Sequence, residues 1–319
     1  MGVSRRTFLG TMAAAGVAAA GPAMPTRVLG KTGAKVSILA FGGGSRYMQY
    51  KEEDEALAAL NHALDLGITY IDTADDYGRN HLSEQRIGKV LKGRREGIFL
   101  ATKVSPRDPD AASRSFEASL KALGMDRVDL LHIHSVTSMD DLAKIEEKGG
   151  VWDLVNKWKD QKMTRFIGIT GHADPAALKA ALERHDFDCT QMALNAGTVA
   201  MMNGQGGMVP NPKVQACFET MALPVAQKKK MGVLAMKIFA QEALVGQAPV
   251  DKLLQYTLSL PITAAVVGMP KREQIADNAR IAKAFAPMPP SEMKRMSESL
   301  SSKNKTALDL WFRDHLDAC

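Results

Sequence analysis

The sequence predicts an α/β protein folded as a (β/α)8 barrel, and three observations support this fold class. Stretches of β-branched and apolar residues alternate with amphipathic stretches along most of the chain. There are eight such pairs, the number found in a closed barrel. Asp72, Lys103 and His134 end three successive apolar stretches, so polar residues recur every 31 positions. That interval is about one strand, one helix and two short loops, the unit that joins parallel strands.

The elements can be placed in order from this alternation. Two short apolar runs, 26–30 and 35–38, flank a turn that contains Gly33 and predict an N-terminal β-hairpin. We expect the barrel strands near residues 38–42, 69–73, 98–104, 127–134, 166–170, 189–194, 232–238 and 264–269. We expect the helices near residues 53–66, 83–92, 113–123, 152–162, 175–185, 213–230, 249–259 and 271–285.

The barrel is expected to span residues 24–290 and to be followed by a helical tail at 291–319. The proline-rich segment 286–290 ends the alternation, and helical stretches are expected near 291–300 and 305–316. An apolar stripe on the tail is expected to pack on the core, with an oligomer contact as the alternative: Leu308, Trp311, Phe312 and Leu316. The sequence does not determine the oligomeric state.

A doubly wound sheet would also alternate strands and helices. That fold would require a glycine-rich G-x-G-x-x-G segment after the first strand. Residues 41–46 read Phe-Gly-Gly-Gly-Ser-Arg and do not supply it. The barrel is therefore the preferred prediction.

Residues 1–23 have the pattern of a twin-arginine export signal. Ser-Arg-Arg-Thr-Phe-Leu at 4–9 precedes an uncharged, alanine-rich stretch at 10–20, and small residues suited to cleavage follow. The apolar stretch is too short to span a bilayer comfortably. We therefore expect a periplasmic protein with no stable membrane insertion after cleavage. The alternatives are a cytoplasmic protein with a frayed N-terminus and a protein anchored by an uncleaved signal.

Composition excludes several other classes of function. A formal net charge of +6 is mild for 319 residues, and the basic residues are scattered, so nucleic acid is not an expected partner. The cysteines, Cys189, Cys217 and Cys319, form no C-x-x-C pair, which gives no indication of zinc or an iron–sulfur cluster. No metal site is predicted.

The stretch from Ile68 to Gly78 indicates chemistry at a strand end. Its first half is apolar and β-branched, and its second half is acidic and turn-forming, so Asp72 ends a strand and Tyr77 follows on the loop. A lysine ammonium near a tyrosine lowers the pKa of the phenol from about 10, and a buried aspartate can orient that lysine. Lys103 and Asp72 would then prepare Tyr77 as a proton donor. His134 would hydrogen-bond a carbonyl oxygen, so the set suits carbonyl reduction.

These residues and their contexts resemble the aldo-keto reductases. The contexts are Tyr-Ile-Asp-Thr-Ala-x-x-Tyr-Gly, Ala-Thr-Lys and Asp-Leu-Leu-x-Ile-His, and the resemblance covers roughly residues 26–285. It implies a catalytic tetrad of Asp72, Tyr77, Lys103 and His134. It also implies hydride transfer between a nicotinamide cofactor and a small carbonyl compound or alcohol.

The resemblance further implies a cofactor site on the later strands. Thr170 keeps a hydroxyl, but Gly171 stands where the family has asparagine, with His172 as an open substitute, and Met236 stands where it has a stacking tyrosine. A basic pair at a helix start favours NADP(H) over NAD(H) because it suits a 2′-phosphate. The predicted cofactor residues are Gly43, Thr170, Gly171, Gln191, Met236, Lys237, Gly268, Met269, Lys271, Arg272, Gln274, Asp277 and Asn278.

Three segments at the catalytic end are expected to close over substrate: the surroundings of Tyr47 and Tyr50, residues 136–150 and the loop-forming stretch 203–212. Two alternative functions stay open. In one, an exported enzyme retains its cofactor and cycles between paired substrates or a redox partner. In the other, the chain is a non-catalytic, cofactor-binding regulatory subunit.

Overall fold

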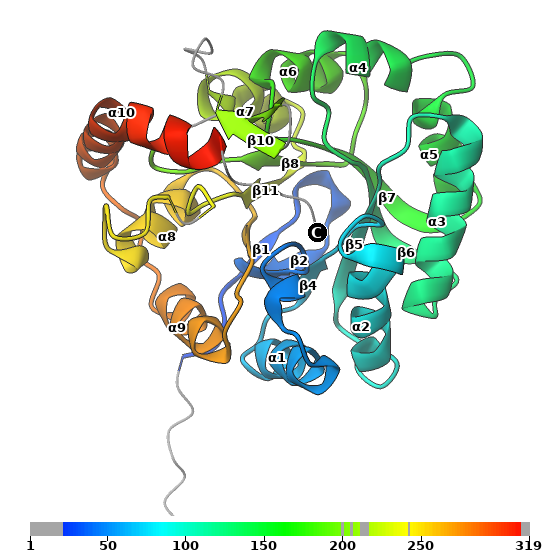
Figure 1. The fold of residues 1–319 in the computed structure, drawn as a ribbon, viewed down its shortest axis with the longest axis horizontal. Coiled ribbons are helices and arrows are strands. Elements are labelled where there is room, and N and C mark those ends of the chain that lie inside the picture. The colour runs from blue at the N-terminus through cyan, green and yellow to red at the C-terminus, as the bar shows by residue number, and fades with distance from the viewer. Residues whose placement is uncertain (1–21, 199–200, 205–206, 211–216, 242, 314–319) are drawn as a thin grey trace, which may run out of the picture.

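The computed structural model describes residues 22–198, 201–204, 207–210, 217–241 and 243–313. Eight parallel strands close into a barrel, and helices surround it (Figure 1), so the predicted fold class is confirmed. The barrel strands are β3 (Leu39–Gly42), β4 (Tyr70–Asp72), β5 (Phe99–Val104), β6 (Val128–Ile133), β7 (Thr164–Gly171), β8 (Cys189–Ala193), β11 (Gly232–Met236) and β12 (Ala264–Val267). β12 pairs with β3 and closes the ring.

The outer ring follows the predicted amphipathic stretches. Its helices are α1 (Glu53–Asp65), α2 (Leu82–Leu91), α3 (Pro109–Leu123), α5 (Val151–Asp160), α6 (Pro175–Arg184), α7 (Phe218–Lys228), α8 (Val250–Ser259) and α9 (Arg272–Lys283). α3 and α6 show why such helices begin where they do. Each has a proline in its first turn and an aspartate N-cap, Asp108 or Asp174, whose carboxylate accepts backbone N–H groups.

The barrel floor is apolar and closed. β1 (Thr26–Val28) and β2 (Lys35–Ser37) form the predicted hairpin, which places Leu29 and Val36 in the inner cluster. Above them, the rings of Tyr70, Phe99 and Phe166 stack at centroid distances of 5.4 and 6.1 Å. Because side chains alternate along a strand, residues two positions beyond this layer also point inward, at the carboxyl end of the barrel.

Two of the connections contain secondary structure beyond the expected elements. The segment 203–212, expected to be a loop, overlaps two strands: β9 (Met201–Gly204) pairs antiparallel with β10 (Gly207–Pro210). Residues 136–150 contain α4 (Met139–Ile145), which the Ser138 side chain caps.

The tail forms one helix, α10 (Pro290–Arg313), where two had been expected, since no proline or glycine interrupts it. The structure does not describe the side chains of the predicted stripe, residues 1–21 of the predicted signal at 1–23, or residues 314–319. Among the described helices, none combines the length and the apolar character that a membrane crossing requires.

Candidate active site

Lys103 is the centre of a buried hydrogen-bonded group at the carboxyl end of the barrel. Its Nζ donates to Asp72 Oδ2 at 2.7 Å, to the Thr73 carbonyl oxygen at 2.6 Å and to the Tyr77 phenolic oxygen at 3.2 Å. Asp72 and Lys103 are both buried, so each charge depends on the other for compensation. An ammonium beside a phenol favours the phenolate, and this contact therefore prepares Tyr77 to release a proton.

The strands fix these positions. Asp72 is the last residue of β4 and pairs in register with Ala101 of β5, two residues before Lys103. Tyr77 follows on the β4–α2 connection, where Gly78 has a φ of 80°, a conformation that favours glycine. The Tyr77 ring lies close to Gly44 of the β3–α1 connection, since a Cβ atom there would be 3.3 Å from the ring.

His134 comes directly after β6 and faces the same cavity. Its backbone N–H donates to the Val104 carbonyl at 3.0 Å, which continues the β5–β6 pairing. Its ring lies edge-on to the Tyr77 ring at a centroid distance of 5.7 Å. Its Nδ1 is 2.9 Å from Ser105 Oγ. The structure thus brings Asp72, Tyr77, Lys103 and His134 to one end of the barrel.

His132 is a second histidine at this level, which the sequence reasoning did not single out. It pairs in register with Lys103, is fully buried, and has no hydrogen-bond partner at either ring nitrogen among the described residues. Burial, then the charges of Lys103 and His134, hold its pKa well below the usual value. His132 is therefore a neutral group beneath the site. His132 lies two positions before His134, and residues two apart on a strand point to the same face, so the sequence could have indicated that His132 faces the barrel interior.

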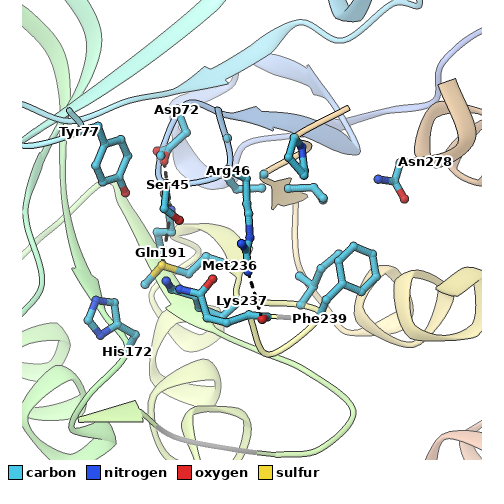
Figure 2. Close-up of a pocket in the computed structure, with 18 of the residues that line it drawn as sticks. Ser45, Arg46, Asp72, Tyr77, His172, Gln191, Met236, Lys237, Phe239 and Asn278 are labelled. Atoms are coloured by element: carbon cyan, nitrogen blue, oxygen red, sulfur yellow. Dashed lines mark hydrogen bonds between the residues drawn. The ribbon is translucent and has the colours of Figure 1, made fainter. Parts of the chain in front are cut away.

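The tetrad opens into a cavity of about 1100 Å³. Figure 2 shows Tyr77 and His172 in one part of this cavity and Asn278 in a distant part. The lining includes eleven of the predicted residues: Asp72, Tyr77, His134, Gln191, Met236, Lys237, Gly268, Lys271, Gln274, Asp277 and Asn278. A cavity of this size and length suits an elongated ligand.

Gln191 and Met236 fit a nicotinamide near the tetrad. Gln191 Nε2 contacts Asp72 Oδ2 at 3.4 Å and Met236 Sδ at 3.7 Å. Gln191 Oε1 and Asp72 Oδ1 are buried and accept no hydrogen bond from any described residue. A buried amide oxygen without a partner is costly, and a carboxamide N–H₂ is the kind of donor that would satisfy it. Met236 supplies a polarizable thioether where the family has a ring.

The far part of the cavity fits phosphate and adenine groups. Lys271 is the N-cap residue of α9, and this helix end attracts anions. Gln274, Asp277 and Asn278 follow on that helix and line the cavity. Arg46 and Arg280, which no sequence pattern indicated, also line the cavity. Arg46 Nη2 donates to the Gln241 carbonyl at 3.2 Å and so links the β3 and β11 loops across the cavity (Figure 2).

The other predicted cofactor residues lie beside the cavity and do not line it. Gly43 packs under the site, where a Cβ would be 2.8 Å from the Asp72 carbonyl. Thr170 Oγ1 accepts the Ser135 N–H at 2.7 Å, and Gly171 lies against Leu178. The remaining two are Met269, which is buried, and Arg272, the exposed first residue of α9.

Two further residues support the catalytic end: His172, which the sequence offers as an open substitute for the family's asparagine, and Arg107, which no sequence pattern indicates. His172 lines the cavity next to Gly171, and its Nε2 lies 3.2 Å from Ser135 Oγ. Arg107 binds Asp141 through two parallel contacts, Nε to Oδ1 at 2.9 Å and Nη2 to Oδ2 at 3.0 Å. It also donates to the His134 carbonyl at 2.7 Å. Arg107 therefore holds the backbone that carries His134.

Comparison with known proteins agrees with this geometry. The aldo/keto reductase family model matches residues 39–249. L-galactose dehydrogenase of Arabidopsis thaliana is 36% identical over 159 residues, 46% of this chain and 48% of that protein. The aldo-keto reductase yakc [NADP(+)] of Schizosaccharomyces pombe is 34% identical over 163 residues, 46% of this chain and 45% of that protein. The aligned region thus spans about half the length of each relative.

The fold agrees with a solved structure as well. The holo form of an aldo-keto reductase from Bacillus halodurans superposes with a TM-score of 0.69 at 23% identity, over 86% of this chain and 96% of that one. This likeness concerns the fold. Together with the family model and the grouped Asp, Tyr, Lys and His, it identifies the chain as an enzyme of the aldo/keto reductase family, the nicotinamide-dependent carbonyl oxidoreductases.

Proposed function

We propose that this enzyme interconverts a small polyhydroxylated carbonyl compound and its alcohol with NADP(H). The observation that carries the proposal is the hydrogen-bonded chain from Asp72 through Lys103 to Tyr77, next to His134 at one end of the cavity. The bound dinucleotide would supply or accept the hydride. The residues of the chain bind the substrate oxygen and handle its proton.

Each residue of the tetrad has a distinct part in this chemistry. Tyr77 is the proton donor to the carbonyl oxygen in reduction and the acceptor in oxidation. Lys103 stabilises the phenolate form of Tyr77, and Asp72 compensates and orients Lys103. His134 and Tyr77 together would contact the substrate oxygen, where negative charge develops.

The polar lining next to the tetrad supports a substrate with several hydroxyl groups. Five polar residues line the cavity together with His134: Arg107, Ser135, Thr137, Asp141 and His172. A site built to hydrogen-bond hydroxyl groups discriminates against analogues that lack them, because its own polar groups are then left unpaired. L-galactose dehydrogenase, one of the relatives, acts by its name on a sugar. Sugars and related polyols are thus the first substrates to test.

The preference for NADP(H) rests on Lys271. Its side chain lines the cavity at the start of α9, whereas Arg272 does not. The named cofactor of the yeast relative, NADP(+), is consistent with this choice. Charge-assisted hydrogen bonds contribute about 1.5–3 kcal/mol, so Lys271→Ala should weaken NADPH binding roughly 10-fold to 100-fold and leave NADH binding nearly unchanged.

Fluorescence titration of NADPH and NADH checks this assignment. Arg272→Ala is the matched control, since it removes a neighbouring charge that is outside the cavity lining. Equal losses for both cofactors in Lys271→Ala would show that Lys271 does not read the 2′-phosphate. A parent enzyme that prefers NADH would refute the choice of NADP(H).

The activity itself is tested by following NADPH absorbance in both directions. NADPH is consumed with a panel of aldehydes, ketones and aldoses, and it is formed from NADP⁺ with the matching polyols and lactols. Turnover of at least one pair that is abolished in Lys103→Met supports the proposal. An enzyme that binds the dinucleotide and turns over nothing would favour the non-catalytic regulatory role. The intact tetrad argues against that role, because a structural subunit does not need all four groups.

Export by the twin-arginine route is part of this proposal and rests on Ser-Arg-Arg-Thr-Phe-Leu at residues 4–9. An exported enzyme would carry its dinucleotide out in the folded state. Fractionation of cells that express the full chain, compared with a variant in which Arg5 and Arg6 are both lysine, tests it. Equal distribution of the two proteins would refute the export signal.

A further inference from the structure

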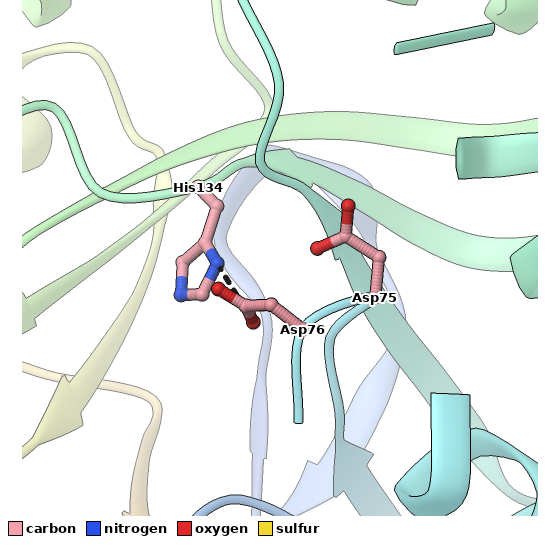
Figure 3. A group of neighbouring side chains, drawn as sticks. All are labelled: Asp75, Asp76 and His134. Carbon is pink, nitrogen blue, oxygen red and sulfur yellow. Dashed lines mark ion pairs between the residues drawn. The ribbon is translucent and has the colours of Figure 1, made fainter. Parts of the chain in front are cut away.

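Two acidic residues and a serine surround one edge of the His134 ring. Figure 3 shows Asp75, Asp76 and His134 together, with the dashed contact running from one ring nitrogen to Asp76. That nitrogen is Nδ1, which lies 3.4 Å from Asp76 Oδ1 and 2.9 Å from Ser105 Oγ. The other nitrogen, Nε2, is on the side of the ring away from Asp76 (Figure 3), and the His134 side chain lines the cavity.

The direction of the Ser105 hydrogen bond is fixed by Asp75. Ser105 Oγ donates to Asp75 Oδ1 at 2.6 Å, and the Ser105 N–H donates to Oδ2 at 3.0 Å. Ser115 Oγ donates to Oδ2 as well, at 2.5 Å. A hydroxyl has a single proton, and here that proton is given to a carboxylate that can only accept. Ser105 Oγ can therefore only accept from His134 Nδ1.

Asp76 presents a second acceptor to the same nitrogen. Burial alone would raise the pKa of this carboxyl, but the neighbouring His134 and the Lys103 ammonium outweigh it and lower the pKa to about 2. Asp76 is thus a carboxylate near neutral pH. Both atoms that face Nδ1 are acceptors, so Nδ1 carries a proton in the neutral ring as well as in the imidazolium.

We propose that Asp75, Ser105 and Asp76 act as positioning residues that lock His134 in the Nδ1–H tautomer. The substrate-facing Nε2 then accepts a hydrogen bond when the ring is neutral and donates one only when the ring is an imidazolium. The neutral site is then matched to an alcohol, which brings a hydroxyl proton. The protonated site is matched to a carbonyl, which brings only lone pairs. This inference rests on the proposed function, and it makes pH select the substrate that the site binds.

The charged and titratable groups around the ring come from four elements. Asp75, Asp76 and Tyr77 lie on the β4–α2 connection, and Lys103 lies on β5. His132 of β6 is neutral beneath the ring, and Arg107 binds the His134 carbonyl from the β5–α3 connection. A divalent cation would need the same carboxylate oxygens, but those of Asp75 already accept three hydrogen bonds. The cluster thus serves the histidine.

The tautomer can be observed without turnover. Long-range ¹H–¹⁵N spectra of the full chain labelled with ¹⁵N-histidine separate a protonated from an unprotonated ring nitrogen, and His134→Gln assigns the His134 signals. At a pH where the ring is neutral, we expect a protonated Nδ1 and an unprotonated Nε2, with and without added NADP⁺. A neutral ring protonated at Nε2 would overturn the proposal, whatever the enzyme's activity.

Kinetics test the consequence. In the parent enzyme, KM for the carbonyl should rise as His134 loses its proton, while KM for the alcohol should fall. The double variant Ser105→Ala/Asp76→Asn removes the hydroxyl acceptor and replaces a carboxylate, which can only accept, with an amide that can also donate, so Nδ1 is no longer obliged to carry the proton. The change of the carbonyl KM with pH should then shrink by about tenfold, equivalent to about 1.4 kcal/mol. A double variant that keeps the parent's tautomer and the parent's pH profile would contradict the proposal.

The double variant Ser113→Ala/Asp160→Asn is a matched control, because these side chains lie on α3 and α5 outside the cavity lining. It should keep the parent's profile. An enzyme with the expected tautomer that turns over no carbonyl would refute the proposed function and leave the tautomer assignment standing. The two failures are therefore distinguishable.

Discussion

Replacing Tyr77 with phenylalanine separates the chemistry of the site from its architecture. The change removes one oxygen, which accepts a hydrogen bond from Lys103 Nζ at 3.2 Å. Lys103 keeps its shorter bonds to Asp72 Oδ2 and the Thr73 carbonyl, at 2.7 and 2.6 Å. The buried pair therefore stays compensated, and the loss of one hydrogen bond should change the free energy of unfolding by about 1 kcal/mol.

The effect on turnover should be much larger. A positioned general acid contributes about 10²–10⁴ in rate, which corresponds to a loss of about 2.7–5.5 kcal/mol of transition-state stabilisation. Dinucleotide binding should persist, because Gln191 and Lys271 are untouched. The assay is single-turnover reduction with saturating NADPH, combined with fluorescence titration of the cofactor and urea denaturation of each variant.

Tyr70→Phe is the matched control for the loss of a phenolic oxygen. The Tyr70 ring is buried in the stack on the barrel floor, and its hydroxyl has no hydrogen-bond partner among the described residues. Its removal should leave turnover unchanged and leave stability equal or higher, since an unpaired buried hydroxyl is costly. If Tyr77→Phe reduces substrate within a few-fold of the parent, Tyr77 is not the proton donor. Equal rate losses in both variants would show that the assay reports packing.

Three further predictions concern the rest of the molecule. Gly30 has a φ of 50°, and a Cβ there would be 2.2 Å from the Gly232 nitrogen, whereas Gly33 has a φ of 72° and open space. In urea denaturation, Gly33→Ala should lower the free energy of unfolding by about 1–2 kcal/mol, and Gly30→Ala should lower it by about 1–3 kcal/mol more. Equal losses in the two variants would show that the backbone around Gly30 shifts to make room for the added methyl group. The hydrogen bond that the His81 ring donates to the Glu84 carboxylate, opposed by burial, raises the pKa of His81. The stability that this contact contributes is therefore complete below the unfolded pKa of about 6.5 and is lost as pH rises through the folded pKa. Denaturation across pH measures the free energy of unfolding, and His81→Gln should remove the part of its pH dependence that His81 causes. An unchanged slope would show that another group causes this dependence. If the enzyme is exported, as proposed, no dinucleotide pool surrounds it, and it should release its cofactor slowly. Periplasmic protein that is washed exhaustively and then denatured should yield near-stoichiometric dinucleotide. Protein without dinucleotide would contradict the retention of the cofactor.

The spacing of Asp72, Lys103 and His134 predicted that they lie together, because barrel geometry converts spacing into position. Asp72, Lys103 and His134 recur at the same phase of successive strand units, and parallel strands present such positions at one end. Tyr77 belongs to the same group because its loop is short. The fold class and the tetrad follow from a regular repeat, which is the kind of information that a single sequence carries.

The cofactor residues were harder to place because their side-chain directions depend on backbone geometry at element ends. Lys271 and Arg272 look equivalent in the sequence, but the first is the N-cap of α9 and the second is its first residue. Only Lys271 reaches the cavity lining. One step in position at a helix start changes the direction of a side chain by about 100°, and the sequence does not show where the helix begins to within one residue.

Arg46 and Arg107 were not predicted because each acts across a distance in sequence. Arg46 binds a carbonyl 195 positions later, and Arg107 binds Asp141, 34 positions later. Neither contact leaves a local pattern. The pairing of β9 with β10 was missed for a related reason, since the glycine-rich sequence 203–207 has the composition of a loop and only the pairing of the two strands distinguishes it.

His134 shows how these two kinds of information combine in the active site. The strand period places its Cα, but two independent devices determine what its ring can do. Arg107 holds the His134 carbonyl, and Asp141 in turn holds the Arg107 guanidinium through two contacts. Ser105 and Asp76 hold Nδ1 from the other side. A ring fixed at its backbone and at one nitrogen has only Nε2 left for substrate, so the protonation state of that single atom decides whether the site offers a donor or an acceptor.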